Sequence, residues 1–234
     1  HDGQISAVDA VFDSGLALTA GTDPPAPSHY AVDLAAGTFR LGSAPNGPVT
    51  AHVRGDATGG AYAEDAASLM LRIAMRAAGL SLVDWQAVAG LTVAAPMATG
   101  FFAGQETGML SALDALADSI GAHFGFDRQG RFTVGRLTEP LETATEDFDE
   151  SAIVSLEREP SALPLWRQRL GYARYWRPLS DGESAAALGA EARSDLAAPH
   201  RYADAEDPAI RIRHILAGDL QKDGLLATEA DAAT

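Results

Sequence analysis

The tripeptide Asp13-Ser14-Gly15 is the first stretch whose residue types suggest chemistry. It interrupts an apolar run, as does the active-site loop of an aspartic peptidase, where two carboxylates share one proton because their mutual repulsion raises one pKa. The sequence contains no second Asp-Ser-Gly or Asp-Thr-Gly, so a peptidase would need a dimer to supply the other carboxylate. Asp, Ser and Gly also favour β-turns, each for its own physical reason. We therefore expect an exposed turn at Asp13, where a change to Asn is nearly neutral.

Other patterns that could support catalysis or ligand binding indicate no site. The six histidines are dispersed without an HExxH pair, and the sequence has no G-x-S-x-G nucleophile elbow and no phosphate-binding glycine loop. We interpret His123 as a strand-edge residue. Asp147, Asp149 and Glu150 could coordinate calcium, but the ligand order and central glycine of an EF-hand are absent. We interpret them as part of a solvated acidic loop and predict no cofactor and no metal.

One stretch rich in aromatic residues and arginines, residues 165–178, carries the candidate binding surface. Strand alternation would place four large side chains on one face, namely Trp166, Leu170, Tyr172 and Trp176, with Arg167 and Arg169 on the other. Such a face could stack on sugar rings, but aromatic residues on one strand face more often stabilise by burial in a core or subunit contact. The predicted interface residues are Trp166, Arg167, Arg169, Tyr172, Tyr175 and Trp176.

The composition narrows the class of protein. Basic residues number 17 against 32 acidic ones, and the net charge of -15 argues against a surface that reads nucleic acid or binds anionic lipid. There is no cysteine, which excludes disulfides and cysteine nucleophiles. No uninterrupted apolar run approaches the roughly 20 residues of a membrane span. The start at His1 and the Ala-rich end at 225–234 suggest a segment of a longer chain.

The elements that must position these residues follow from periodicity. Closely spaced turn signals over residues 5–56 alternate with short strand-like runs and predict an antiparallel meander. Helical spacing over 61–80 predicts a helix with Glu64 and Asp65 in its first turn, and a second helix over 81–91 would be capped by Ser81. A third, over 108–121, would place its apolar residues on one face, namely Leu110, Leu113, Leu116, Ala117 and Ile120.

An aromatic hairpin should follow this third helix, over residues 123–137. We expect four of its side chains to bury against Leu113, Leu116 and Ile120 of the helix, namely Phe124, Phe126, Phe132 and Val134. Beyond it, we predict an exposed acidic connection over 139–151, strands over 152–159 and 165–178, and a helix over 183–198.

These elements make an α+β protein, with antiparallel β hairpins and packed amphipathic helices. We divide the chain into three parts: an antiparallel β portion at 5–56, helices with the aromatic hairpin at 57–137, and a part at 138–234 that holds the acidic connection, β strands and helical C-terminal residues.

Three passages together resemble a known class of protein. Residues 10–23 (AVFDSGLALTAGTD), 30–56 (YAVDLAAGTFRLGSAPNGPVTAHVRGD) and 110–137 (LSALDALADSIGAHFGFDRQGRFTVGRL) are similar to segments of the hub-type tail-tip or baseplate proteins of tailed bacteriophages. The similarity is one of sequence style across most of residues 5–177. It implies that Asp13-Ser14-Gly15 is the turn of a hairpin joining residues 8–12 to 16–20.

The resemblance implies a structural protein of the virion, made in the bacterial cytoplasm, that assembles with other tail proteins and with itself, most naturally as a trimer. It brings no catalytic residues. A ring of such chains would place acidic segments such as 139–150 toward a DNA channel or solvent, because a positive lining would grip the phosphates. The alternatives are a hydrolase, either a dimeric aspartic peptidase at Asp13 or a cell-wall hydrolase with two carboxylates, and a glycan-binding module.

Overall fold

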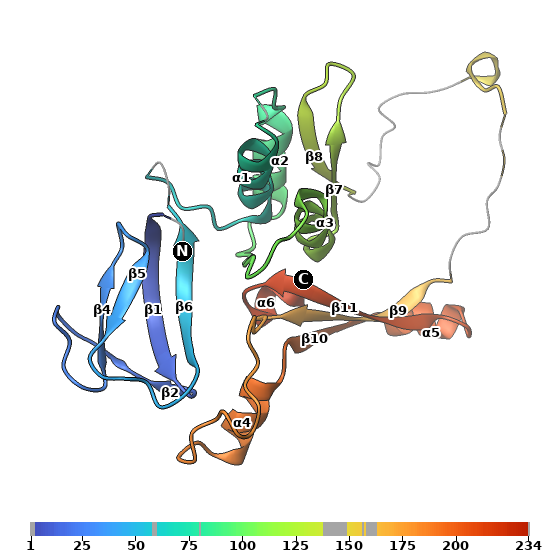
Figure 1. Cartoon of the computed structure of the whole chain (residues 1–234). Coiled ribbons are helices and arrows are strands. Elements are labelled where there is room, and N and C mark those ends of the chain that lie inside the picture. Colours follow the sequence, from blue (N-terminus) through green and yellow to red (C-terminus); the bar gives the residue numbers. More distant parts are fainter. Residues whose placement is uncertain are drawn as a thin grey trace.

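The structure is a computed structural model that describes residues 3–57, 60–79, 81–137, 149–155, 157 and 163–233. The chain combines helices with mostly antiparallel sheets, so the predicted α+β class is confirmed. Figure 1 shows three regions: N-terminal strands, a central group of helices with a hairpin, and a long sheet that extends away from them.

The N-terminal strands form two small sheets instead of the predicted meander. Their bounds are β1 (Ile5–Asp13), β2 (Leu16–Ala17), β3 (Thr19–Ala20), β4 (His29–Asp33), β5 (Thr38–Leu41) and β6 (Val49–Asp56). One sheet has the order β2-β1-β6 and the other β3-β4-β5, in which β3 runs parallel to β4. The expectation of a meander is wrong, because in a meander each strand pairs with the next one along the chain. Here β6 pairs with β1, from Ile5 opposite Asp56 to Asp13 opposite Val49.

Three helices follow at nearly the predicted places: α1 (Ala66–Ala78), α2 (Trp85–Ala94) and α3 (Met109–Ser119). Asp65 is the N-cap of α1 and accepts a hydrogen bond from the N–H of Ser68, while Gly79 ends the helix in the left-handed conformation. The predicted cap at Ser81 is wrong: Asp84 caps α2. Residues 82–84 are extended because they pair with the next hairpin, with Phe132 N–H donating to Leu82 C=O and Asp84 N–H to Phe132 C=O.

The hairpin consists of β7 (Ala122–Phe126) and β8 (Phe132–Arg136). Phe132 and Val134 are buried as expected, and Phe124 is partly buried against the same core. Phe126 is 62% exposed, so its predicted burial is wrong. It lies next to the hairpin turn, where its ring meets Phe132 edge to face at 6.1 Å and its other side faces solvent. Leu110 was predicted to share the apolar face of α3 with Leu113 and Leu116, but it is 60% exposed in the first turn of the helix.

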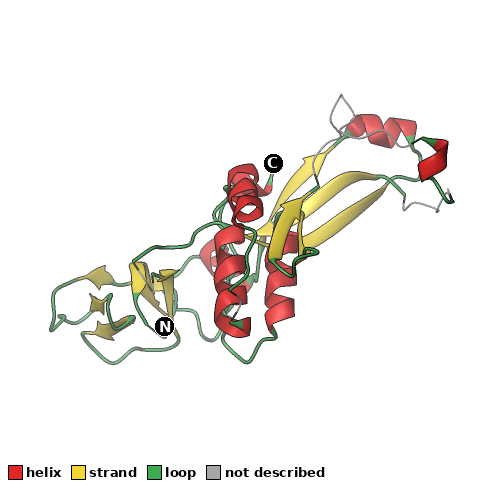
Figure 2. Ribbon diagram, turned by 90° about the horizontal axis from the view of Figure 1, so that it is seen from above, coloured by secondary structure: helices red, strands yellow, loops and turns green. Residues whose placement is uncertain are grey.

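The C-terminal part contributes a three-stranded sheet with the order β10-β9-β11. Its elements are β9 (Leu165–Tyr172), α4 (Ala190–Ala197), β10 (Arg201–Glu206), α5 (Pro208–Arg213), β11 (Gly218–Leu226) and α6 (Glu229–Ala232). β10 runs antiparallel to β9, and β11 runs parallel to it. We call this sheet with α5 the arm. Figures 1 and 2 show that it extends beyond the helices, with α5 at its far end.

Several predictions for this part differ from the structure. A strand was predicted over 152–159, and its first residues do not form one. Ala152 ends a short 3-10 helix, Glu150–Ala152, and residues 153–155 have no strand structure. Residues 139–148 of the acidic connection lie outside the described residues. The strand predicted over 165–178 ends at Tyr172, since Ala173 turns into the left-handed region at φ 47°. The helix predicted over 183–198 begins only at Ala190.

The main hydrophobic core contains residues from before and after the acidic connection, 139–151. It is built by α1, α2, α3 and β8 together with the inner ends of the arm strands and α6. Phe132, Met70, Leu113 and Leu116 are among its largest buried side chains, and Leu226 of β11 is as deeply buried as they are. The arm is therefore anchored in the same hydrophobic core as the helices. Among the described residues, no helix is both long and apolar enough to span a bilayer.

Candidate assembly surface

The tripeptide around Asp13 is the turn of a hairpin, as the resemblance implied. Asp13 of β1 pairs with Leu16 of β2, and the two corner residues have positive φ, 51° at Ser14 and 84° at Gly15. Glycine accepts this conformation without steric cost, which explains its presence at the second corner. The predicted exposure is wrong, however, because Asp13 is only 8% exposed.

The carboxylate of Asp13 acts as a hydrogen-bond acceptor for a distant loop. It accepts hydrogen bonds from the backbone N–H of Asn46 at 2.8 Å, the side-chain amide of Asn46 at 2.9 Å, the N–H of Gly47 at 3.1 Å and the hydroxyl of Ser14 at 3.2 Å. Burial alone raises the pKa of Asp13, but these hydrogen bonds outweigh it, so its pKa lies below the ordinary value. Asp13 is therefore an ionised structural group, unlike the acid of a proton-sharing pair.

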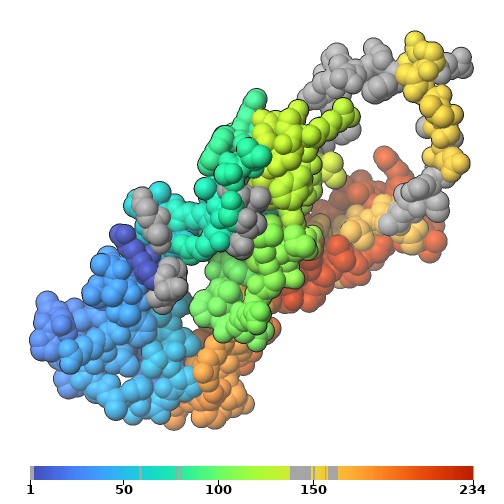
Figure 3. Space-filling model, turned by 45° about the horizontal axis from the view of Figure 1, so that its top comes forward, coloured from blue at the N-terminus to red at the C-terminus, as the bar shows by residue number. Residues whose placement is uncertain are grey.

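The outer side of this turn is covered by another part of the same chain. The N–H of Ala185 donates to the carbonyl of Ser14 at 2.9 Å. A Cβ placed on Gly15 would lie 2.6 Å from a methyl of Leu196 and 2.9 Å from one of Leu188. In Figure 3 the orange segment around α4 accordingly lies against the blue N-terminal portion. We call residues 173–199 the docking segment, since it covers the outer side of the Asp13 turn.

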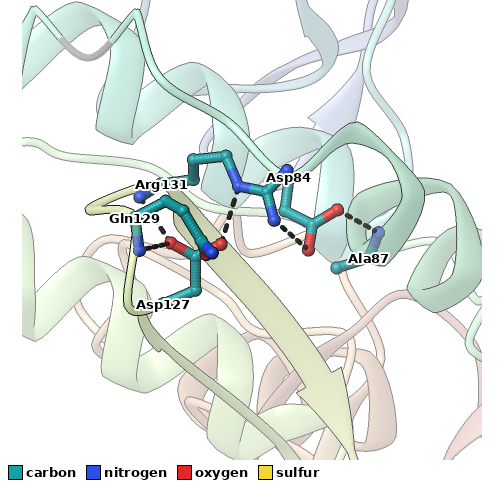
Figure 4. A network of polar contacts seen from close by, with 5 residues as sticks. All are labelled: Asp84, Ala87, Asp127, Gln129 and Arg131. Atoms are coloured by element: carbon teal, nitrogen blue, oxygen red, sulfur yellow. Dashed lines mark hydrogen bonds and ion pairs between the residues drawn. The ribbon is translucent and has the colours of Figure 1, made fainter.

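Other carboxylates also serve structural roles. In the network of Figure 4, Asp127 accepts hydrogen bonds from the N–H of Gln129 and from Nε of Arg131, while Asp84 caps α2 through the N–H of Ala87. Arg131 also lies 4.0 Å from Asp84 and so links the hairpin turn to the start of α2. The backbone hydrogen bond from Arg131 is the largest cause that lowers the pKa of Asp127.

The calcium hypothesis concerns residues only partly described. Asp149 accepts hydrogen bonds from the N–H and hydroxyl of Ser151 and from the N–H of Ala152, and so caps a short turn. Asp147 lies outside the described residues. Within the described ranges, no group of three or more histidines and carboxylates is arranged to hold a metal ion.

The two predicted interface arginines bind within their own sheet. Arg167 pairs with Asp219 at 2.7 Å and with Glu206 at 4.0 Å, and Arg169 pairs with Asp204 at 2.7 Å. The register explains the pairs, because Arg167 of β9 lies opposite both Glu206 of β10 and Asp219 of β11. One face of the arm thus carries a row of partly exposed ion pairs, for which exposed pairs worth about 0–1 kcal/mol are the reference.

The predicted aromatic residues do not form one platform. Trp166 lies near the outer end of β9, where the guanidinium groups of Arg167 and Arg211 stack on its ring at 5.0 and 4.5 Å. Tyr172 lies at the inner end of the strand, about 20 Å away by the strand rise, and packs on the core. Trp176 lies beyond the strand in a separate cluster with Phe101 and Phe102.

Tyr175 is the remaining predicted interface residue. It is half-buried in the docking segment, and its N–H donates to the carbonyl of Pro199 at 2.9 Å. The six predicted interface residues therefore belong to three places: the outer arm, the core and the docking segment.

The largest exposed aliphatic side chains of the arm lie at its end. Ile212, Ile215 and Leu216 are 83%, 92% and 73% exposed, and Leu165 and Leu220 at the adjoining strand starts are about two-fifths exposed. We call residues 208–216 the arm tip. Clustered aliphatic side chains outside a core indicate an interaction surface. Sequence reasoning missed the arm tip because residues 199–234 gave no clear periodicity, although the alternation of Ile and Arg over 210–213 was a usable signal.

His200 is a buried group between the docking segment and β10. Its side chain is 4% exposed, and neither ring nitrogen has a hydrogen-bond partner among the described residues. Asp223 of β11 lies 3.8 Å from Nδ1, beyond hydrogen-bond distance, and its carboxylate accepts a hydrogen bond from the hydroxyl of Tyr202 at 2.8 Å. Burial is the main cause that lowers the pKa of His200, opposed by the charge of Asp223 and assisted by that of Arg174.

No protein-family model matches the chain, and no curated protein matches it.

Proposed function

We propose that this chain is a structural, hub-like component of a bacteriophage tail tip or baseplate, which assembles with itself and with other tail proteins in the virion. The observation that carries the proposal is the arm tip, where Ile212, Ile215 and Leu216 are exposed at the end of a sheet whose other end is anchored in the core. A rigid element that presents aliphatic side chains far from the body suits contact with another protein. The sequence resemblance supplies the context of the tail.

The chemistry of Asp13 favours this proposal over a dimeric aspartic peptidase. A peptidase aspartate must face its counterpart across an open dimer interface and share a proton with it. Asp13 instead accepts hydrogen bonds from Asn46, Gly47 and Ser14, and Leu188 and Leu196 lie over its turn. Proteolysis that pepstatin inhibits, and that Asp13→Asn abolishes, would support the peptidase.

The other two alternatives receive less support. A glycan platform needs adjacent aromatic faces, whereas Trp166 is stacked between arginines and Trp176 lies in a different cluster. A cell-wall hydrolase needs one protonated and one ionised carboxyl across a cleft. The carboxyl groups of Asp13 and Asp127 have lowered pKa values and accept several hydrogen bonds each, so neither suits the role of the protonated acid.

In this proposal the chain forms a homo-oligomer, most simply a trimeric ring. It is made in the bacterial cytoplasm and is located in the virion. The proposal assigns no sequence-specific binding of nucleic acid to the chain, whose net charge is -15. Within the ring, we now assign the contact to the arm tip in preference to the strand over 165–172, because Arg167 and Arg169 are engaged with Asp219 and Asp204.

Immunogold labelling tests the function. An antibody raised against the purified chain would be applied to tailed particles released by the bacterium that encodes it, and gold is expected at the tail end distal to the capsid. Antibody preabsorbed with the purified chain is the control. Label on the capsid, or a protein found only in the soluble lysate and never on purified particles, would contradict the proposal.

A further inference from the structure

The arm tip combines two kinds of exposed group. Ile212, Ile215 and Leu216 provide an aliphatic surface, and Arg211 and Arg213 lie among them in the sequence. Within the described residues, neither arginine has a carboxylate at ion-pair distance, although Arg211 stacks on Trp166. A partner for this surface should offer aliphatic contact together with carboxylates, since buried or half-buried cations need a counter-charge.

The outer side of α3 has the complementary composition. Leu110 is 60% exposed, and Asp114 follows one turn later on the same side of the helix and is also exposed. Phe102, 59% exposed, and Glu106 precede the helix in an exposed stretch. In the part of the chain that the structure describes, Asp114 and Glu106 form no ion pair, whereas Asp118 of the same helix is already paired with Lys222.

Charge distinguishes α3 from the other exposed apolar helix. Trp85 and Val93 on the outer side of α2 are 59% and 82% exposed, but the helix from Trp85 to Ala94 contains no acidic or basic residue. The outer side of α2 can therefore offer apolar contact to the arm tip, but the helix has no carboxylate to pair with the arginines of the arm tip. The outer side of α3 satisfies both requirements, so it is the better match.

The arm tip cannot reach α3 of its own chain. Lys222 of β11 is paired with Asp118 of α3 at 3.0 Å, which places the inner part of the arm beside that helix. From Lys222 the paired strand runs outward to Gly218, roughly 13 Å by the strand rise, and the arm tip lies beyond it. Figure 1 shows α5 at the end of the arm away from α3. Contact therefore requires a second copy.

We propose that the arm tip of one copy binds the outer side of α3 of a second copy, with Arg213 facing Asp114 and Ile215 facing Leu110. The two surfaces differ, so the contact is head to tail and each copy can both give and receive one. Repetition closes a ring or extends a chain. This inference rests on the self-assembly in the proposed function, but it concerns association in solution and is tested apart from any particle.

Sedimentation equilibrium of the purified chain over a wide concentration range is the experiment. The wild-type chain is expected to self-associate, and Arg213→Glu or Ile215→Asp should each lower the association constant about tenfold or more, as loss of a contact central to an interface does. Arg128→Glu, at the exposed hairpin turn, is the matched control for charge, and Val93→Asp is the matched control for an exposed aliphatic side chain. Both controls should associate as the wild type does.

Mixing the variants tests which surfaces meet. Arg213→Glu retains an intact α3, and Asp114→Arg retains an intact arm tip, so each alone should be monomeric. Their mixture should associate into alternating assemblies, because the arginine tip of one variant meets Asp114 of the other and the glutamate tip meets the new arginine on α3. A chain with both changes should regain self-association, because the charges are exchanged across the contact. A monomeric wild type, normal association of Arg213→Glu, or a mixture that stays monomeric would each overturn the inference. Gold label on tail tips would remain possible in all three cases, so the two proposals fail separately.

Discussion

Asp13 and Asn46 are 33 positions apart in the chain, yet the carboxylate of Asp13 accepts both the backbone N–H and the side-chain amide of Asn46 through the same oxygen, at 2.8 and 2.9 Å. This contact fastens the loop before β6 to the hairpin turn after β1. The docking segment then covers the turn from outside through Ala185 and Leu196. The Asp13 turn is therefore a point where three separate stretches of the chain meet.

Asp13→Asn should lower the free energy of unfolding by about 1–3 kcal/mol, the cost of placing an amide against buried N–H donors. This replaces the expectation of a neutral change. Asp33→Asn is the control, because Asp33 is exposed and accepts hydrogen bonds from the N–H groups of Ala35 and Ala36. Urea unfolding at pH 7 measures both. Equal small effects for the two variants would show that the contact with Asn46 adds no stability.

Gly15→Ala should destabilise the protein more than Gly130→Ala. Both glycines have positive φ, 84° and 75°, so both changes introduce backbone strain of similar size. Only at Gly15 would the new methyl collide with Leu188 and Leu196, whereas nothing lies within 4 Å of the position at Gly130. Faster proteolytic cleavage within residues 173–199 of the Gly15 variant is also expected. Identical unfolding midpoints and cleavage rates would mean that the docking segment does not depend on this turn.

Phe132→Ala should lower the free energy of unfolding by about 3–5 kcal/mol, as large cavities in a well-packed core do. Phe132 is 1% exposed at the centre of the main core. Phe126→Ala, on the same hairpin, should change the free energy of unfolding much less, because that ring is largely in solvent. Denaturant titration of the pair measures the difference. A Phe126 variant as unstable as the Phe132 variant would place the hairpin end inside a core.

Lowering the pH from 7.5 to 5.5 should destabilise the protein through His200. Burial lowers the pKa of this group below its ordinary 6.5, so the folded state binds fewer protons than the unfolded state in this range. Its stabilising effect is therefore complete above pH 6.5 and decreases as the pH falls toward the lower folded pKa. Asp223, Tyr202 and Arg174 are the charged or titratable groups around it.

His200→Gln should make the urea midpoint less dependent on pH over this window, since glutamine does not titrate. Exposed His123→Gln is the control and should keep the slope of the wild type. If the His200 variant retains the full pH dependence, the group responsible lies elsewhere.

Local signals in the sequence predicted most of the helices and strands. The acidic residues at the start of α1, the glycines at 79 and 121 and the alternation in β5 and β6 each act through neighbouring residues, so they are readable without the fold. Asp65 was expected in the first turn of α1 and is instead its N-cap. The turn at Asp13-Ser14-Gly15 belongs to the same class. The α+β class followed from the order of these elements.

Tertiary structure decided the features that depend on distant partners. Pairing of Val83 with Phe132 moved the start of α2 to Trp85, and pairing of β6 with β1 replaced the expected meander. Burial of Asp13 depends on Asn46 and Leu196, and the engagement of Arg167 depends on Asp219, 52 positions away. Exposure of the arm tip likewise follows from where β9, β10 and β11 leave the core. None of these is encoded in a local pattern, because burial and charge pairing are properties of the packed chain.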